Sequence, residues 1–136
     1  MKLTIATPKK LALEMEVTSI TVPSSNGEIT ILPHHMHLLS LLKEGIITAK
    51  SEKEEQYMAI GGGYLETDGT NVQILVSRAY KQDEIDEKST EEAIQNAQKI
   101  LIETKDKAER SEASSLLRRS VVNLKLLGKV RRKSKS

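Results

Sequence analysis

The fold is decided by residues 72–101, VQILVSRAYKQDEIDEKSTEEAIQNAQKIL, where the apolar residues change their spacing. Within residues 72–76 they recur at every second position, which is the period of a half-buried strand. From Ser89 the spacing becomes helical, and Ser89 followed by Glu92 has the form of a capping box at a helix start. The sequence therefore predicts strands up to about residue 88 and helices after it.

Upstream of residue 80 the two-residue period recurs in short runs that turn-forming residues separate. The expected strands lie at Leu3–Ile5, Leu11–Leu13, Ile20–Val22, Ile29–Ile31, Ile46 and Val72–Val76. Ser24–Gly27 and Asp68–Asn71 have the composition of tight turns. Short strands at this spacing are typical of a sandwich or barrel. Leu, Ile and Val must fill its core, because the chain has three Tyr, no Phe and no Trp.

Downstream, two helices of about fifteen to twenty residues are expected. The first presents apolar residues between Ala93 and Ala108, and the second ends at Gly128, a residue typical of helix C-caps. Charged residues dominate 105–112, so the chain should reverse there and form an antiparallel hairpin. The predicted organisation is a β-sandwich over residues 1–87, a helical hairpin over 88–130 and a basic tail over 131–136.

Charge is distributed unevenly along the 136 residues, although the net charge is only +2. Residues 1–117 carry thirteen basic and nineteen acidic side chains, whereas residues 118–136 carry eight basic side chains and no acidic one. An acidic body with a basic C-terminal segment indicates an acidic partner for that segment, or else a solvated tail.

Composition excludes several classes of protein. There is no cysteine, which excludes a disulfide scaffold and thiolate chemistry, and no apolar run is long enough to span a bilayer. The N-terminus reads as a strand rather than a signal peptide, so we expect a cytosolic protein or one made where it works. Single-stranded nucleic-acid binding needs aromatic platforms, and a nucleic-acid module would also need a basic sandwich, so neither is favoured.

Three local features could carry chemistry, and each has a structural explanation. His34, His35 and His37 have no recognised metal-ligand spacing, so we expect loop or partner contacts. The glycines at 61–63 precede a strand rather than a helix, which favours a β-bulge or a close backbone contact over a phosphate loop. The acidic run 83–87 has no accompanying histidine or apolar pocket, so we expect a solvated segment. The sequence predicts no catalytic residue, no metal site, no cofactor and no enzyme activity.

Three strings in order resemble the epsilon-subunit family of the F-type ATP synthases, and the likeness covers nearly the whole chain. Residues 27–35, GEITILPHH, are similar to the family's G-x-h-x-h-L-P-N-H segment, where h is apolar. The family usually continues with Ala-Pro-Leu, where this chain has MHL at 36–38. Residues 62–66, GGYLE, resemble its glycine-led strand, and residues 74–79, ILVSRA, resemble its last strand.

The resemblance implies a non-catalytic subunit of the rotor stalk, peripheral on the cytoplasmic face of a bacterial inner membrane or the equivalent stromal or matrix face. Its partners would be the gamma subunit, the c-ring and a beta subunit, with no nucleic acid and no direct membrane insertion. It would couple c-ring rotation to ATP synthesis, and its helices could restrain ATP hydrolysis. An adaptor whose helical hairpin binds an unrelated acidic partner is the alternative function.

The resemblance also carries over candidate contact residues. The gamma and c-ring contacts would be Glu28, Leu32, Pro33 and His35, and the inhibitory contacts to the beta subunit would be Arg118, Arg119 and Lys125.

Some family members bind ATP through an I/L-D-x-x-R-A motif, and Asp86 and Arg119 are the candidate ATP contacts here. Ser89 and Thr90 replace the Arg-Ala pair, and Asn123 replaces a second arginine, so we predict weak ATP binding or none.

Overall fold

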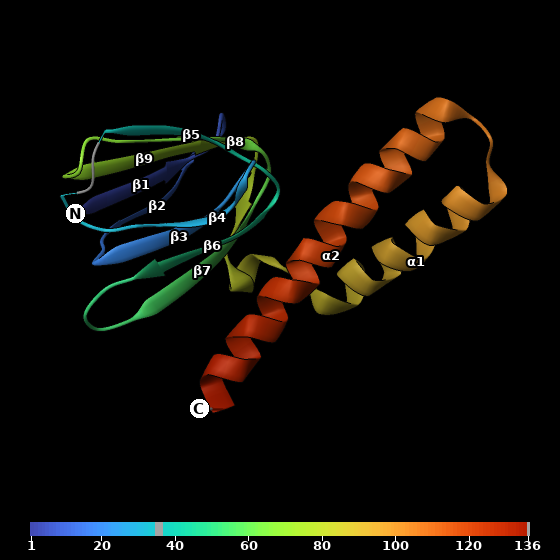
Figure 1. Cartoon of the computed structure of the whole chain (residues 1–136). Coiled ribbons are helices and arrows are strands. Elements are labelled where there is room, and N and C mark those ends of the chain that lie inside the picture. Colours follow the sequence, from blue (N-terminus) through green and yellow to red (C-terminus); the bar gives the residue numbers. More distant parts are fainter. Residues whose placement is uncertain (35–36, 136) are drawn as a thin grey trace. The chain divides into compact units, whose positions relative to one another are not determined.

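A computed structural model describes residues 1–34 and 37–135 and divides the chain into two compact units, Met1–Lys81 and Gln82–Ser136 (Figure 1). The first unit holds strands β1 (Lys2–Ala6), β2 (Leu11–Glu16), β3 (Ser19–Ser24), β4 (Gly27–Ile31), β5 (Leu38–Leu42), β6 (Gly45–Lys50), β7 (Glu55–Ile60), β8 (Gly63–Thr67), β9 (Asn71–Val76) and β10 (Ala79–Tyr80). The second holds a short 3₁₀ turn η1 (Gln82–Glu84) and helices α1 (Glu87–Glu103) and α2 (Lys107–Lys135). The predicted order, a β-sandwich followed by two helices, is confirmed.

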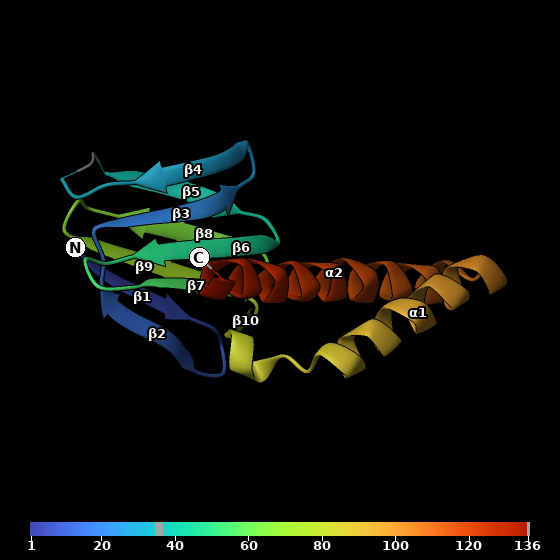
Figure 2. The same cartoon turned by 90° about the horizontal axis from the view of Figure 1, so that it is seen from below.

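The strands form one sheet that folds into two layers, with the order β10-β7-β6-β3-β5-β8-β9-β1-β2, while β4 pairs with β3. Figure 2 shows β3, β6 and β7 running side by side in one layer. Strand β3 pairs with β5 at Ser24 and Leu42, where the sheet passes from one layer to the other. Strands β1 and β9 pair in parallel, and the other pairs are antiparallel.

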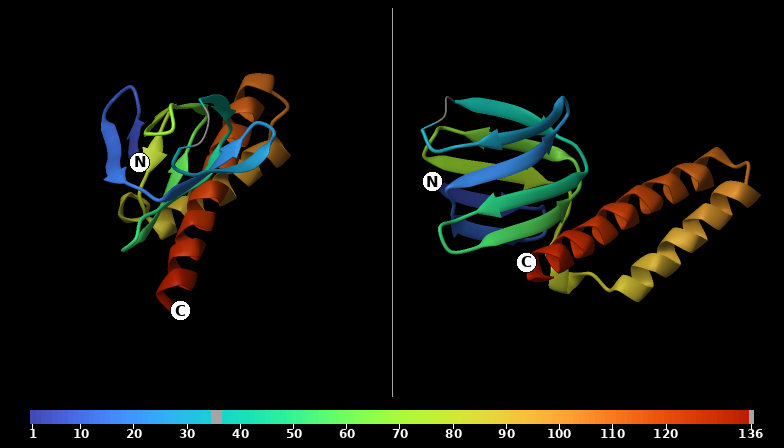
Figure 3. Two further views of the ribbon diagram at one scale, coloured as in Figure 1. Left: turned by 60° about the vertical axis from the view of Figure 1, so that its left-hand side comes forward. Right: turned by 60° about the horizontal axis from the view of Figure 1, so that its bottom comes forward.

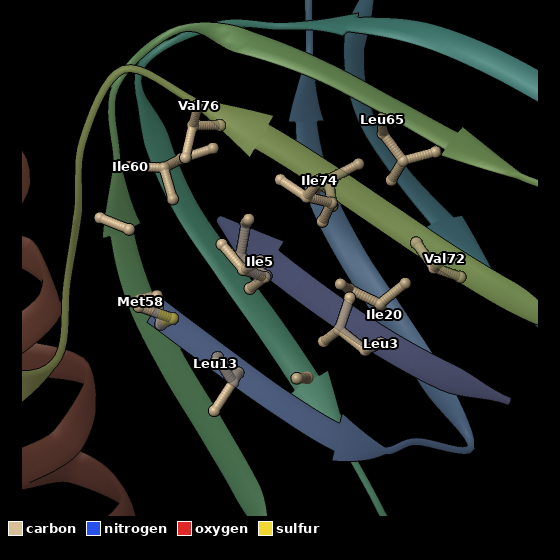
Figure 4. Packing of buried hydrophobic residues seen from close by; sticks show 14 of the residues in the cluster. Leu3, Ile5, Leu13, Ile20, Met58, Ile60, Leu65, Val72, Ile74 and Val76 are labelled. Atoms are coloured by element: carbon tan, nitrogen blue, oxygen red, sulfur yellow. The ribbon is translucent and has the colours of Figure 1, made fainter. Parts of the chain in front are cut away.

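The core between the layers is aliphatic, as predicted. Every second residue of β9 is buried, namely Val72, Ile74 and Val76, while the residues between them are exposed. Figure 4 shows these side chains meeting others from the opposite layer, including Ile20 of β3 and Met58 of β7. All buried members of this cluster belong to the first unit, so the sandwich has a hydrophobic core of its own.

The two predicted turns are also present. Ser24 and Gly27 face each other at the end of the β3–β4 hairpin, where Gly27 takes a φ of 118° that a side chain would disfavour. Asp68–Asn71 connects β8 to β9, and the Asp68 carboxylate accepts hydrogen bonds from the backbone N–H groups of Thr70 (2.9 Å) and Asn71 (2.8 Å). These bonds, with that of Asn71 the larger cause, hold the pKa of Asp68 below its ordinary value.

Helices α1 and α2 run alongside each other in opposite directions (Figure 3), as predicted. The reversal at residues 104–106 overlaps only the start of the predicted region 105–112, because α2 begins at Lys107. The predicted cap at Ser89 is wrong, because α1 begins earlier. Its N-cap is Asp86, whose carboxylate accepts a hydrogen bond from the Ser89 backbone N–H at 3.0 Å. Ser89 is therefore the third residue after the N-cap and not the N-cap itself.

The predicted end of the second helix is also wrong. Helix α2 passes through Gly128 to Lys135, so it has 29 residues, while α1 has 17. The φ of Gly128 is not positive, so the backbone does not turn there as it would at a glycine C-cap. A helix tolerates an internal glycine at a cost of about 1 kcal/mol. Ala108 is exposed rather than part of the buried face, whereas Ala97 and Ala113 are buried.

Candidate interaction surfaces

The first predicted contact segment follows β4 into the next loop. Glu28, Leu32 and Pro33 are all exposed, and the Leu32 side chain keeps 55% of its surface in contact with solvent. Glu28 and Leu32 are four residues apart on extended chain, so they share a side and lie about 13 Å apart. His35 lies outside the described residues. The segment thus offers one apolar and one acidic position to a partner, and its role stays a prediction.

His34 is held against the β8–β9 turn. His34 takes a φ of 66°, and its backbone N–H donates a hydrogen bond to the Gly69 carbonyl at 3.0 Å. His37 lies beside Glu66 and Asp68 at the rim of a polar hollow. Among the described residues, no three His, Cys, Asp or Glu side chains are grouped so as to hold a metal ion.

A row of apolar side chains crosses the outer face of five neighbouring strands. Pairing places Leu41 of β5 beside Tyr64 of β8, Tyr64 beside Leu75 of β9, Leu75 beside Ala6 of β1, and Ala6 beside Leu11 of β2. We call these five residues the apolar row. The strands that carry them lie next to one another in Figure 1.

The apolar row is open to solvent along its length. Leu41 is 67% exposed, Leu11 56%, Leu75 41% and Tyr64 40%. Leu39, which follows the same side of β5, is 69% exposed. The next parallel row is different, because it runs from Leu39 to Glu66, Gln73, Thr4 and Glu14 and is polar after its first member. A contiguous exposed apolar strip with a polar border is typical of a protein–protein interface.

Sequence reasoning missed the apolar row. The alternation of β9 already put Val72, Ile74 and Val76 inward, which obliges Leu75 to point outward. That signal was present in the sequence, but the partners of Leu75 on β1 and β8 depend on strand pairing, which periodicity does not give.

The predicted basic contacts lie on α2 but do not form one cluster. Arg118 and Lys125 are exposed and seven residues apart, so they share a side of the helix about 10 Å apart. The Arg118 Nη2 donates a hydrogen bond to the Ser115 Oγ at 3.4 Å. Arg119 is half-buried and turned by about 100° from Arg118. The geometry therefore presents Arg118 and Lys125 together, with Arg119 apart from them.

Asp86, one of the two candidate ATP contacts, already has hydrogen-bond partners within the chain. The Asp86 carboxylate is engaged as the helix cap, and its hydrogen bonds from the Ser89 hydroxyl and backbone N–H hold the pKa of Asp86 below its ordinary value. Next to it, Glu87 forms an ion pair with Arg131 across the hairpin. Hydrogen bonding to Glu87 raises the pKa of Arg131.

No helix in the described part of the chain is long and apolar enough to cross a membrane.

This chain is similar to ATP synthase epsilon chains over most of its length. A family profile described as the β-sandwich domain of the ATP synthase delta/epsilon chain matches residues 1–82. The ATP synthase epsilon chain of Syntrophobacter fumaroxidans is 38% identical over 128 residues, which cover 94% of this chain and 96% of that one. The chloroplastic ATP synthase epsilon chain of Adiantum capillus-veneris is 32% identical over 124 residues, covering 91% and 94%.

A structural likeness extends into the mitochondrial enzymes. One chain in the cryo-EM structure of the Euglena gracilis mitochondrial ATP synthase, OSCP/F1/c-ring, superposes with a TM-score of 0.75 at 26% identity. The superposition covers 85% of this chain and 74% of that chain. A chain of the Tetrahymena thermophila central stalk and c-ring structure shares the fold at 15% identity and a TM-score of 0.56.

Proposed function

The chain belongs to the family of ATP synthase epsilon chains, and we propose that it couples c-ring rotation to ATP synthesis in the catalytic core. It is a non-catalytic subunit of the central stalk. The relatives are matched over nearly their full lengths, so both the sandwich and the hairpin take part in the comparison. An adaptor for an unrelated acidic partner would leave this match without an explanation.

The observation that carries the proposal is the apolar row. A rotor subunit must transmit torque, so it needs a broad surface that stays attached to the shaft. The apolar row crosses five strands of a sheet whose other face is fully packed, so it is both wide and rigid. We assign it to the gamma subunit, because burying exposed Leu and Tyr side chains favours a lasting contact.

The segment after β4 supplies the second proposed contact. Glu28, Leu32 and Pro33 are exposed at positions that the family resemblance assigns to gamma and the c-ring. His35 belongs to the same assignment and lies outside the described residues. Contact with the c-ring would place the subunit peripherally at the membrane face that carries the catalytic core.

The hairpin is the proposed restraint on ATP hydrolysis. Arg118 and Lys125 present two cations on one side of α2, in a C-terminal segment with no acidic residue after Glu112. An acidic loop of a beta subunit fits this charge, since Arg pairs with carboxylates in a bidentate manner. Arg119 is half-buried and contributes less to this surface as the helix stands.

Two variants separate attachment from restraint. The double variant Leu41→Ser with Tyr64→Ser should weaken binding to an ATP synthase core that lacks this subunit, because the apolar row would bury less apolar surface against gamma. Arg118→Ala with Lys125→Ala should leave binding intact and relieve inhibition of ATP hydrolysis. Binding unchanged by the first pair would remove the apolar row from the interface, and loss of binding with the second pair would show that the hairpin serves attachment.

A further inference from the structure

Gly61 and Gly62 precede β8 and Gly63 is its first residue, but the fold does not require glycine at all three positions. A Cβ on Gly63 would lie 2.0 Å from the Leu75 carbonyl oxygen, a backbone atom that cannot move aside. A Cβ on Gly61 would lie 2.2 Å from the Ser77 Oγ. Gly63 therefore excludes a side chain, whereas a Cβ on Gly61 would require the Ser77 and Arg78 side chains to shift.

Gly62 is different. Its φ is not positive, it is exposed, and a Cβ there would meet nothing nearer than the Leu42 carbonyl oxygen at 3.5 Å, an ordinary van der Waals contact. The fold would therefore accept alanine at this position. Glycine loses more backbone entropy on folding than alanine does. Its presence without a structural need therefore indicates a surface position where a side chain would interfere with binding.

Gly62 lines a hollow of about 360 Å3 at the edge of the apolar row. Ala6, Tyr64 and Leu75 of the row line this hollow, and Pro8 is among the other lining residues. None of the lining residues carries a charge, and the polar ones contribute only hydroxyl groups and backbone. An apolar, uncharged group fits these walls, whereas a charged group entering here would lose its hydration without gaining a partner.

We propose that this hollow is a socket for one bulky apolar side chain of the rotor-shaft subunit, and that Gly62 keeps the socket open. The inference rests on the proposed function and adds the chemistry of the contact. The socket is continuous with the apolar row, so a shaft surface that covers the row also reaches the hollow. Anchoring side chains that fill such pockets carry a large share of binding energy, while the flat surroundings exclude water.

Substitution at Gly62 tests the socket. The ATP synthase core without this subunit is titrated with the full chain and with Gly62→Ala and Gly62→Leu, and the dissociation constants are measured. We expect a graded loss, with Gly62→Leu binding about tenfold more weakly or worse and Gly62→Ala less affected, because an added side chain competes with the inserted one. The melting temperatures of both variants should stay near that of the unchanged chain.

Two comparisons make the result specific. Glu52→Leu adds the same side chain on an exposed loop of the sandwich away from the apolar row, and its affinity should not change. Gly63→Ala should fail through folding instead, with a large fall in melting temperature, because of the clash with Leu75.

The outcomes separate the two proposals. If the unchanged chain does not bind the core, the proposed function itself is wrong. If the unchanged chain binds and folded Gly62→Leu binds equally well, the stalk function stands and the socket is overturned.

Discussion

The sandwich and the hairpin reach stability by different means. In the sandwich, Ile5, Ile20 and Ile74 are fully buried between two layers whose strands come from distant parts of the sequence. Helix α1 buries only Thr90 and Ala97, and its Ile102 is 84% exposed. Helix α2 buries Leu126 and Leu127, so the hairpin has an apolar contact as well, but one with fewer large side chains than the sandwich core. The cap at Asp86 and the reversal at 104–106 add local definition.

The difference indicates a division of labour. A unit with a large aliphatic core keeps its shape when its outer face is loaded, which suits the proposed attachment to the shaft. A hairpin that buries fewer large side chains can change its packing at lower cost, which suits the proposed restraint on hydrolysis.

Truncating the sandwich core should give the largest effect. Ile74→Ala removes a fully buried side chain and should lower the free energy of unfolding by about 2–5 kcal/mol. Denaturant unfolding followed by circular dichroism measures the loss. Gln73→Ala, on the exposed side of the same strand, should change it by no more than about 0.5 kcal/mol. Equal effects of the two variants would contradict the description of the core.

Overfilling the hairpin should have a smaller and confined effect. Ala97 is fully buried in α1, so Ala97→Leu should cost about 1–3 kcal/mol of hairpin stability. Amide hydrogen exchange should quicken in α1 and α2 while the sandwich strands keep their protection. Asn96→Leu places the same side chain at an exposed neighbour and serves as the control. Faster exchange in the sandwich as well would mean that the two units are not independent.

The α1 cap should produce a pH-dependent effect. Because the pKa of Asp86 is lowered in the folded state, its contribution is fully present above its ordinary pKa and is lost as pH falls through the lower folded value. Asp86→Ala should remove this contribution at neutral pH, speeding amide exchange in the first turn of α1. Asp86→Asn keeps a capping oxygen and should abolish the acid dependence. An unchanged acid dependence in Asp86→Asn would assign it to another group.

ATP should have the smallest effect. The Asp86 carboxylate is occupied by the Ser89 hydrogen bonds, and the sequence lacks two of the cations expected opposite a triphosphate. Millimolar ATP should therefore leave the melting temperature of the chain unchanged. A clear upward shift, lost in Arg119→Ala, would show that the hairpin binds nucleotide.

The alternation in β9, the tight turn at Gly27 and the change of period near residue 88 are local signals, so the sequence predicts them well. Strands β5 and β7 were not among the expected strands. The ends of the helices were harder to predict from the sequence. Asp86 and Ser89 are both good capping residues three positions apart, and the hydrogen bond from the Ser89 N–H to the Asp86 carboxylate decides between them. Gly128 resembles a C-cap in sequence, but the helix continues through it.

The interaction surfaces likewise divide into those that are local in the sequence and those that depend on strand pairing. Leu32 and Pro33 could be selected from a motif because they are adjacent in the chain. The apolar row could not, since Leu41 and Leu11 become members of one surface only through the pairing of five strands. Surfaces built across a sheet need the register before they can be recognised.

The central claim is that the sandwich attaches the subunit to the rotor and the hairpin restrains hydrolysis. ATP hydrolysis by the alpha/beta/gamma core, titrated with the full chain and with a version ending at Glu87, tests it most directly. The account predicts that both bind the core and that only the full chain slows turnover. Equal slowing by the two proteins would contradict the role of the hairpin, and failure of either to bind would contradict attachment through the sandwich.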